Sequence, residues 1–170
     1  MQNIDEKDIK VVSTQTTSVS RFKIIEDELF IADRYAKYSF IKIKPGICVI
    51  IETDKGLVVL KEYRYPIKQW SYEFVAGIID DGESPKEAAI REIKEETGYI
   101  VDEIISLGEF YPSFGATDEV IYLFYAKCGI KQNSEQEITE LIECEIMKET
   151  EIDNLIISGE FKHGAGWKCQ

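Results

Sequence analysis

The sequence predicts a mixed α/β (α+β) fold in which a mixed sheet lies between helices. Segments rich in β-branched and aromatic residues fill most of the 170-residue chain. Two stretches, 85–97 and 148–158, instead have the apolar spacing of amphipathic helices. The order along the chain is therefore β-rich, helix, β-rich, helix. A chain of this length is sufficient for one domain with a sizeable core.

The N-terminal quarter of the chain is predicted to precede the main domain. Residues 1–19 are polar with a Ser/Thr-rich end, which predicts a flexible arm or one weak strand. Residues 20–45 alternate between apolar and polar side chains, which predicts two or three antiparallel strands with turns near Glu26-Asp27 and Asp33-Arg34. This β extension leads into a main domain at 46–170.

The strands of the main domain are predicted from apolar runs between turn residues. Pro45-Gly46 breaks the chain, and the runs that follow at 47–51 and 57–64 are joined by Asp54-Lys55-Gly56, a typical hairpin turn. Later strand-like segments lie at 71–76, 103–111, 119–127 and 141–147, and the last dozen residues are weakly patterned.

The first helix is predicted to run from Pro85 to Thr97. Ser84 can cap its start, Pro85 suits the first helical position, and Glu87 completes a capping box. Gly98 can adopt the left-handed conformation that ends a helix. The residues expected on its buried stripe are Ala88, Ala89, Ile90 and Ile93.

Three carboxylates crowd the C-terminal half of this helix. Glu92 and Glu96 are four residues apart and share a face, and Glu95 lies three residues after Glu92. Like charges at this spacing destabilise a helix by about 0.2–0.5 kcal/mol per pair, and the helix dipole also disfavours them there. A bound cation would offset the repulsion, and oxygen ligands favour Mg²⁺ or Mn²⁺ over zinc. The alternative is a solvated acidic face.

The stretch from Gly77 to Tyr99 resembles the Nudix box, G-x5-E-x7-R-E-U-x-E-E-x-G-U, in which U is a bulky apolar residue. The matching residues are Gly77, Glu83, Arg91, Glu92, Ile93, Glu95, Glu96 and Gly98. Tyr99 fills the last U position as an aromatic residue. The resemblance implies a Nudix-type α/β/α sandwich with a mixed sheet and, in this chain, an N-terminal antiparallel β extension. It also implies hydrolase activity with Mg²⁺, or alternatively Mn²⁺.

Segments around the box are similar to the ADP-ribose pyrophosphatase subgroup, which has Q-Y-R, E-[LI]-P-A-G and a later Pro-containing segment. The corresponding segments here are 62–64, 73–77 and 111–115, in which Glu62 replaces Gln, Val75 replaces Pro and Phe114 replaces a second Pro. The resemblance implies hydrolysis of the diphosphate bond of a nucleoside diphosphate sugar, with ADP-ribose giving AMP and ribose 5-phosphate.

The resemblance also assigns roles to residues of the box. The carbonyl of Ala76 and the carboxylates of Glu92 and Glu96 match metal ligands, and Glu95 matches an auxiliary ligand. The residues that match structural positions, which brace the loop and the helix, are Gly77, Glu83, Arg91 and Gly98.

Substrate contacts and the general base are expected outside the box. Arg64 matches an arginine that contacts substrate, and a guanidinium fork suits a diphosphate. Glu73 and, more weakly, Glu119 match substrate-side glutamates. The subgroup places its general base on a loop between late strands. The fitting segment is 131–140, in which Glu137 is the first choice and Glu135 the second, although acids in a polar loop are often only solvated.

Charge and cysteine usage exclude several other classes of function. The net charge of −12 argues against binding nucleic acid or an anionic membrane. No apolar run approaches the ~20 residues of a membrane span, and the polar, acidic N-terminus does not resemble a signal peptide. The four cysteines lack C-x-x-C spacing, so neither a zinc site nor a disulfide framework is supported. His163, the sole histidine, is interpreted as a surface bystander. We expect a cytoplasmic protein with a small-molecule partner.

Several alternatives stay open at this point. The same chemistry could act on a GDP-sugar, a dinucleoside polyphosphate or an oxidised nucleotide. A non-catalytic sensor of ADP-ribose or NAD is disfavoured because such sensors commonly lose box glutamates, and all four are present here. A structural protein with a merely solvated helix is the third alternative. The resemblance also implies a homodimer in which the N-terminal strands pack on the partner.

Overall fold

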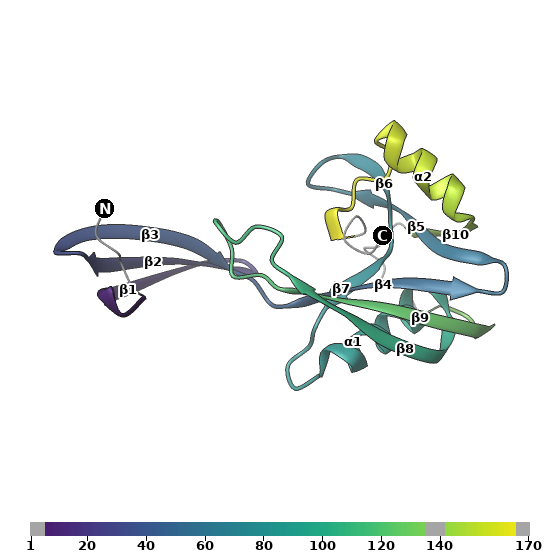
Figure 1. The fold of residues 1–170 in the computed structure, drawn as a ribbon, viewed down its shortest axis with the longest axis horizontal. Helices are drawn as coiled ribbons and strands as arrows, with labels where there is room; N and C mark the ends of the chain where they lie inside the picture. Colours follow the sequence, from purple (N-terminus) through teal and green to yellow (C-terminus); the bar gives the residue numbers. More distant parts are fainter. Residues whose placement is uncertain (1–5, 135–141, 166–170) are drawn as a thin grey trace. The chain divides into compact units, whose positions relative to one another are not determined.

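The computed structural model describes residues 6–134 and 142–165, which belong to two compact units. The first unit contains the chain up to Lys44 together with Ser113–Glu119. The second contains Pro45–Pro112 and the chain from Val120 onwards. The strands and α-helices of both are labelled in Figure 1.

A three-stranded antiparallel sheet forms the first unit. After the short 3₁₀ turn η1 (Glu6–Asp8), its strands follow in the order β1 (Ile9–Val19), β2 (Phe22–Ile31) and β3 (Arg34–Lys42). Residues 9–19, predicted as part of a flexible arm or as one weak strand, pair with β2 along almost their whole length. The segment 113–119 joins this sheet through a bridge between Thr117 and Ile41.

One predicted turn in this unit is wrong. Glu26 and Asp27 lie inside β2 and not at a turn, because both make contacts with neighbouring strands. Lys37 Nζ donates to Glu26 Oε1 at 2.7 Å, and Thr14 Oγ1 donates to Asp27 Oδ1 at 2.6 Å. Cross-strand pairs of this kind stabilise a ladder. The turn near Asp33-Arg34 is confirmed by the positive φ of 62° at Asp33.

A seven-stranded mixed sheet forms the second unit. Its strands are β4 (Gly46–Thr53), β5 (Gly56–Arg64), β6 (Gln69–Glu73), β7 (Val75–Ile78), β8 (Tyr99–Phe110), β9 (Ile121–Lys131) and β10 (Ile142–Met147). The main order is β10-β5-β4-β9-β8, with β6 paired to β5 and β7 paired to β4. The pairing of β4 with β9 is parallel and the other pairings are antiparallel.

The helices α1 (Pro85–Glu92) and α2 (Glu149–Ser158) cover opposite faces of this sheet (Figure 1). Strand β4 divides its side chains between these faces. Val49 packs into the same core cluster as Ala89 of α1, whereas Cys48 and Ile50 pack with Ile152 of α2. The predicted α/β/α sandwich with a mixed sheet is confirmed. No helix in the described ranges is both long and apolar enough to cross a bilayer.

Among the differences in strand boundaries from the sequence prediction, two lie directly before and after the helix segment. The predicted strand 71–76 is divided at Phe74 into β6 and β7, because the chain changes its partner from β5 to β4 at that point. The Phe74 side chain is buried and packs against Phe161. Strand β8 begins at Tyr99, directly after the helix, whereas the predicted segment began at residue 103.

Candidate metal and substrate site

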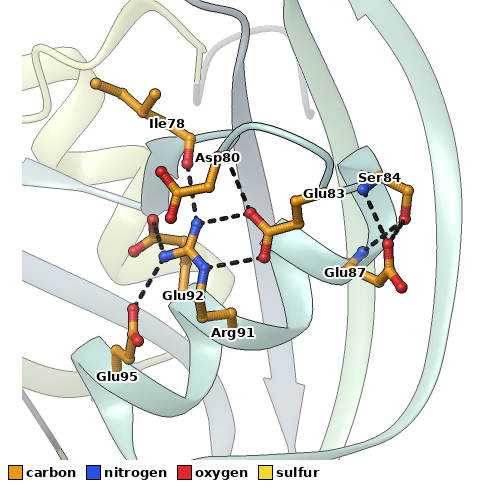
Figure 2. A network of polar contacts seen from close by, with 8 residues as sticks. All are labelled: Ile78, Asp80, Glu83, Ser84, Glu87, Arg91, Glu92 and Glu95. Carbon is orange, nitrogen blue, oxygen red and sulfur yellow. Dashed lines mark hydrogen bonds and ion pairs between the residues drawn. The ribbon is translucent and has the colours of Figure 1, made fainter.

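The capping box at the start of α1 is confirmed. Ser84 Oγ accepts a hydrogen bond from the backbone N–H of Glu87 at 3.3 Å, and Glu87 Oε2 accepts one from the backbone N–H of Ser84 at 2.9 Å (Figure 2). Pro85 occupies the first turn as expected. Hydrogen bonds from the Ser84 side chain and backbone lower the pKa of the Glu87 carboxyl. These contacts fix where the helix begins and hence where its later carboxylates lie.

The last turn of the predicted helix differs from an α-helix. The α-helix ends at Glu92, and Ile93–Thr97 form a π-helical turn, η2, before Gly98 ends it with φ of 76°. The Thr97 hydroxyl donates to the carbonyl of Ile93 and so competes with the regular backbone ladder. Glu92 contacts Arg91 and lies against the backbone at Gly77, whereas Glu96 is buried near Arg64, so the two carboxylates have different neighbours although they are four residues apart. Turns of this kind occur frequently at functional sites.

The apolar stripe of the helix is narrower than predicted. Ala88, Ala89 and Ile93 are buried, but Ile90 is 39% exposed. Ile90 therefore lies on the outward face of the helix, and Ala88, Ala89 and Ile93 form the contact with the core.

Arg91 connects the helix with the preceding loop. Its Nε donates to Glu83 Oε1 at 2.9 Å and its Nη2 donates to Glu83 Oε2 at 3.0 Å. Its Nη2 also donates to the carbonyl of Ile78 at 2.9 Å, and its Nη1 donates to Glu92 Oε1 at 2.7 Å and Glu95 Oε2 at 3.0 Å (Figure 2). One guanidinium therefore contacts three of the four box glutamates.

These contacts shift the ionisation of both partners. The hydrogen bonds to Glu83, followed by those to Glu92 and Glu95, raise the pKa of Arg91 despite its partial burial. The hydrogen bond from Arg91 lowers the pKa of Glu83, and the backbone N–H of Asp80 adds to this by donating to Glu83 Oε2 at 3.1 Å. Both groups are therefore charged at neutral pH, as a brace between loop and helix requires.

Close approach explains the two glycines of the box. A Cβ added at Gly77 would lie 2.0 Å from Glu92 Oε1, so the carboxylate rests directly against the backbone of β7. Gly77 follows Ala76, whose carbonyl is the predicted metal ligand. At Gly98 the positive φ already favours glycine, and an added Cβ would lie 2.2 Å from the carbonyl oxygen of Gln132. A larger residue at either position would displace its neighbours.

An ion pair between a half-exposed arginine and a buried glutamate lies on the hairpin of β5 and β6. Arg64 Nε donates to both carboxylate oxygens of Glu73, at 3.0 and 3.1 Å, and Arg64 Nη2 donates to Glu73 Oε2 at 2.5 Å. Arg64 Nη2 also lies 3.0 Å from Glu62 Oε2. The side chains of Glu73 and Glu62 are only 4% and 12% exposed, whereas that of Arg64 is 42% exposed. The two glutamates therefore fix the guanidinium, which remains accessible to solvent.

Glu96 links this pair with the helix. The residue is 4% exposed and lies within electrostatic reach of Arg64. Burial lowers the pKa of Arg64, but the hydrogen bond to Glu73 and the charges of Glu73, Glu62 and Glu96 outweigh it, so the net pKa is raised. In the second unit, the predicted metal ligand Glu96 thus lies near Arg64 and Glu73, which are the predicted substrate residues of that unit.

The predicted ligand atoms are of the kind that a divalent cation binds. All predicted ligands are oxygens, from the carbonyl of Ala76 and from three glutamates, and Glu92 is already seated against the backbone beside that carbonyl. Within the described ranges, no three His, Cys, Asp or Glu side chains converge into a preformed metal centre. The reason is that Arg91 binds Glu92 and Glu95, whereas Glu96 lies near Arg64.

The roles of the remaining predicted residues stay predictions. Glu119 belongs to the segment 113–119 of the first unit, where burial raises the pKa of its carboxyl, and its substrate role stays a prediction. Glu135 and Glu137, the candidates for the general base, lie outside the described residues.

Sequence reasoning missed two residues beside Arg64. Glu62 was noted only as a departure from a motif, although alternation along a strand places it on the same face as Arg64. His163 is not the surface bystander that we expected, because its Nδ1 is buried and it lies within electrostatic reach of Glu73 and Arg64. No local pattern in the tail indicated this, since its neighbours come from distant strands.

Comparison with known proteins gives a family match and several relatives. The model of the NUDIX domain matches residues 42–163. An ADP-ribose pyrophosphatase of Bacillus subtilis (strain 168) is 30% identical over 132 residues, which are 77% of this chain and 71% of the relative. A methanol dehydrogenase activator of Bacillus methanolicus is 32% identical over 145 residues, which are 82% of this chain and 78% of the relative.

A solved structure supports the fold. The crystal structure of an ADP compounds hydrolase superposes with a TM-score of 0.83 at 20% sequence identity. The match covers 94% of this chain and 89% of that one. At this level of identity the likeness concerns the fold alone.

Proposed function

We propose that this chain, which belongs to the Nudix family, hydrolyses the diphosphate bond of ADP-ribose to give AMP and ribose 5-phosphate. The observation that carries the proposal is the proximity of the Arg64–Glu73 pair to Glu96 of the box. A diphosphate held at Arg64 would then lie beside the box carboxylates. The relative named ADP-ribose pyrophosphatase supports this choice of substrate among nucleoside diphosphate sugars.

Nudix hydrolases generally use a divalent metal, and we assign Mg²⁺ to this chain, with Mn²⁺ as an alternative. The carbonyl of Ala76 and the carboxylates of Glu92 and Glu96 would hold it, with Glu95 as an auxiliary ligand. When bound, the ion neutralises diphosphate charge and acidifies a coordinated water. The donors are hard oxygens, which Mg²⁺ prefers.

Arg64 is assigned to the diphosphate. Its Nε and Nη2 are bound by Glu73 and Glu62, which fixes the plane of the guanidinium. These contacts to Glu73 and Glu62 do not use Nη1, so this group can donate to a phosphate oxygen. The half-exposed position of the side chain allows a ligand to reach it.

Arg91 and Glu83 hold the carboxylates of the helix against the loop and do not touch the substrate in this scheme. The proton of the attacking water is assigned to a loop carboxylate, Glu137 or else Glu135. Glu119 remains a further candidate for a substrate contact.

A substrate panel tests the proposed function. ADP-ribose, GDP-mannose, diadenosine polyphosphates and an oxidised nucleotide are compared at matched concentration with Mg²⁺ or Mn²⁺, in ¹⁸O-labelled water. We expect the highest kcat/KM for ADP-ribose, and the labelled product identifies the phosphorus that is attacked. A ranking of ADP-ribose below the other substrates would contradict the choice. Binding of ADP-ribose without turnover of any substrate would favour the sensor alternative.

A homodimer formed through the N-terminal sheet is part of the proposal. Exposed apolar side chains are frequent on β1 to β3, including Val11, Phe22, Ile24 and Tyr35. Such a surface is typical of an interface. Sedimentation velocity checks the mass, and Ile24→Glu should yield a monomer. We also assign the protein to the cytoplasm, which suits the free thiols of Cys128 and Cys144.

A further inference from the structure

The segment that follows α2 docks on the edge of β6. After Gly159 ends the helix with φ of 76°, the carbonyl of Glu160 accepts a hydrogen bond from the backbone N–H of Tyr72 at 3.3 Å. Phe161 bridges Tyr72 in parallel, and Lys162 Nζ donates to Gln69 Oε1 at 2.5 Å. The segment therefore runs beside the strand that carries Glu73.

Two buried residues anchor this segment on either side of His163. Phe161 is 1% exposed and its ring packs edge-on against Phe74, with 5.2 Å between ring centroids. Ala165 is 7% exposed and packs into the same core cluster. With a core residue two positions before it and another two positions after it, the backbone at His163 is fixed. The packing of Phe161 and Ala165 therefore determines where the side chain of His163 begins.

The imidazole of His163 is the buried polar group that the proposed mechanism does not yet use. Its Nδ1 is buried and has no hydrogen-bond partner in the described part of the chain. Native proteins pair the large majority of buried side-chain polar atoms, and a buried unpaired one costs about 1–3 kcal/mol. The side chain lies within electrostatic reach of Glu73 and Arg64, the pair to which we assign the diphosphate.

The charges around His163 indicate what kind of ligand group can form a hydrogen bond with its Nδ1. Burial lowers the pKa of the imidazole, and this effect outweighs the opposing charge of Glu73, so the ring is neutral at pH 7. A neutral ring beside a carboxylate does not attract a second anion. A hydroxyl, in contrast, carries no charge and can either donate to Nδ1 or accept from it.

We propose that His163, whose side chain is only partly buried, turns when the substrate binds, so that its Nδ1, closed off from solvent in this structure, makes a hydrogen bond to a sugar hydroxyl next to the diphosphate held at Arg64. The inference rests on the proposed function and adds a residue from the C-terminal segment to the site. Binding of the sugar then satisfies a polar atom that the described chain leaves unpaired. The contact favours substrates that present a hydroxyl at this position.

Three substitutions of His163 and one control test the contact. His163→Ala removes it, His163→Asn keeps a polar atom near the place of Nδ1, and His163→Gln places its polar atoms farther out, nearer to Nε2. Lys162→Ala is the control, because it changes the adjacent residue and only its contact with Gln69. For each variant, KM and kcat for ADP-ribose with Mg²⁺ are measured with the melting temperature and the Mg²⁺ concentration for half-maximal activity.

The expected result is a KM for ADP-ribose raised about tenfold in His163→Ala, because one hydrogen bond to a neutral group is lost. The value of kcat should stay within about twofold, and half-activation by Mg²⁺ should not change. His163→Asn should recover most of the KM, whereas His163→Gln and the alanine variant should be alike. Lys162→Ala should resemble the wild type.

Other outcomes overturn the inference. An unchanged KM in His163→Ala, or a lower melting temperature with unchanged KM, means that the imidazole only supports the docked segment. If the wild type hydrolyses nothing in the substrate panel, the proposed function fails. The affinities of the wild type and His163→Ala for ADP-ribose, measured by calorimetry, then decide the contact. Equal affinities, or no binding by either protein, would overturn it.

Discussion

Arg91 donates two parallel hydrogen bonds to Glu83, from Nε to Oε1 at 2.9 Å and from Nη2 to Oε2 at 3.0 Å. Bidentate pairs of this kind are strong and fix orientation as well as distance. The same guanidinium contacts the carbonyl of Ile78 and the carboxylates of Glu92 and Glu95 (Figure 2). The loop after β7, the helix α1 and the turn η2 are therefore tied together by one side chain.

The pH dependence of stability should change in Glu83→Gln. The pKa of Glu83 lies below its ordinary value of 4.5 in the folded chain, because Arg91 hydrogen-bonds the charged form. Its contribution is therefore fully present above the unfolded value and is lost as the pH falls through the lower folded value. Urea unfolding from pH 7 to pH 3 should show a shallower loss of stability in the variant. Identical slopes for the two proteins would contradict this linkage.

Arg91→Lys should impair activity more than folding. Lysine keeps the charge but cannot form the fork, so contacts to Glu83 and to the two other glutamates cannot all be kept. Groups that orient metal ligands typically contribute about 10–100-fold to affinity or activity. We expect a loss of this size in kcat and a higher Mg²⁺ requirement. Lys86→Ala, at an exposed position on the same helix, is the control and should retain both values.

Gly77→Ala should displace the carboxylate of Glu92. The added Cβ would lie 2.0 Å from Glu92 Oε1, so that side chain must rotate away from the backbone of β7. We expect the Mg²⁺ concentration for half-maximal activity to rise at least about tenfold, as for other changes that misplace a ligand. Gly115→Ala is the matched control, because an added Cβ there meets nothing within 4 Å. Similar Mg²⁺ curves for the two variants would refute the argument.

The sequence predicted those parts of the site that depend on near neighbours. The cap at Ser84 and the stop at Gly98 involve interactions within a few residues, so spacing alone located them. The division of the strand at Phe74 could not be predicted, because it depends on which strands are adjacent. The burial of His163 Nδ1 likewise depends on docking against β6, since the tail itself has a weak pattern.

The π-turn is an intermediate case. Thr97 lies one residue before a glycine stop, and its hydroxyl can reach the carbonyl four residues earlier in any helix. Sequence spacing therefore allowed either a regular last turn or a widened one. The structure contains the widened turn, and the two carboxylates have different partners in it, since Glu92 binds Arg91 whereas Glu96 lies near Arg64. The spacing located the acids but not their partners.

Glu96→Gln should abolish most activity without unfolding the protein. The amide is close in size to the buried carboxylate but is a poorer ligand for Mg²⁺, which prefers charged oxygens. We expect kcat to fall at least about 100-fold for ADP-ribose, with a melting temperature within a few degrees of wild type. Glu109→Gln, at an exposed position of β8, should be fully active. Unchanged turnover in Glu96→Gln would overturn the metal assignment.

Arg64→Ala should reduce both stability and substrate affinity. The carboxylate of Glu73 would remain buried without the guanidinium that binds it, which costs about 2 kcal/mol. The loss should stay below the roughly 3–5 kcal/mol typical of a fully buried pair, because Arg64 is partly exposed.

The double variant Arg64→Ala/Glu73→Gln separates the two effects. It should regain part of the stability, since a neutral amide is less costly to bury than a charge. Both variants should show a KM for ADP-ribose raised at least about tenfold, because the donor to the diphosphate is absent from each. Urea unfolding and steady-state kinetics measure the two quantities, and Arg34→Ala, at an exposed position of β3, is the control. If the double variant recovered the wild-type KM together with stability, Arg64 would serve only to neutralise Glu73.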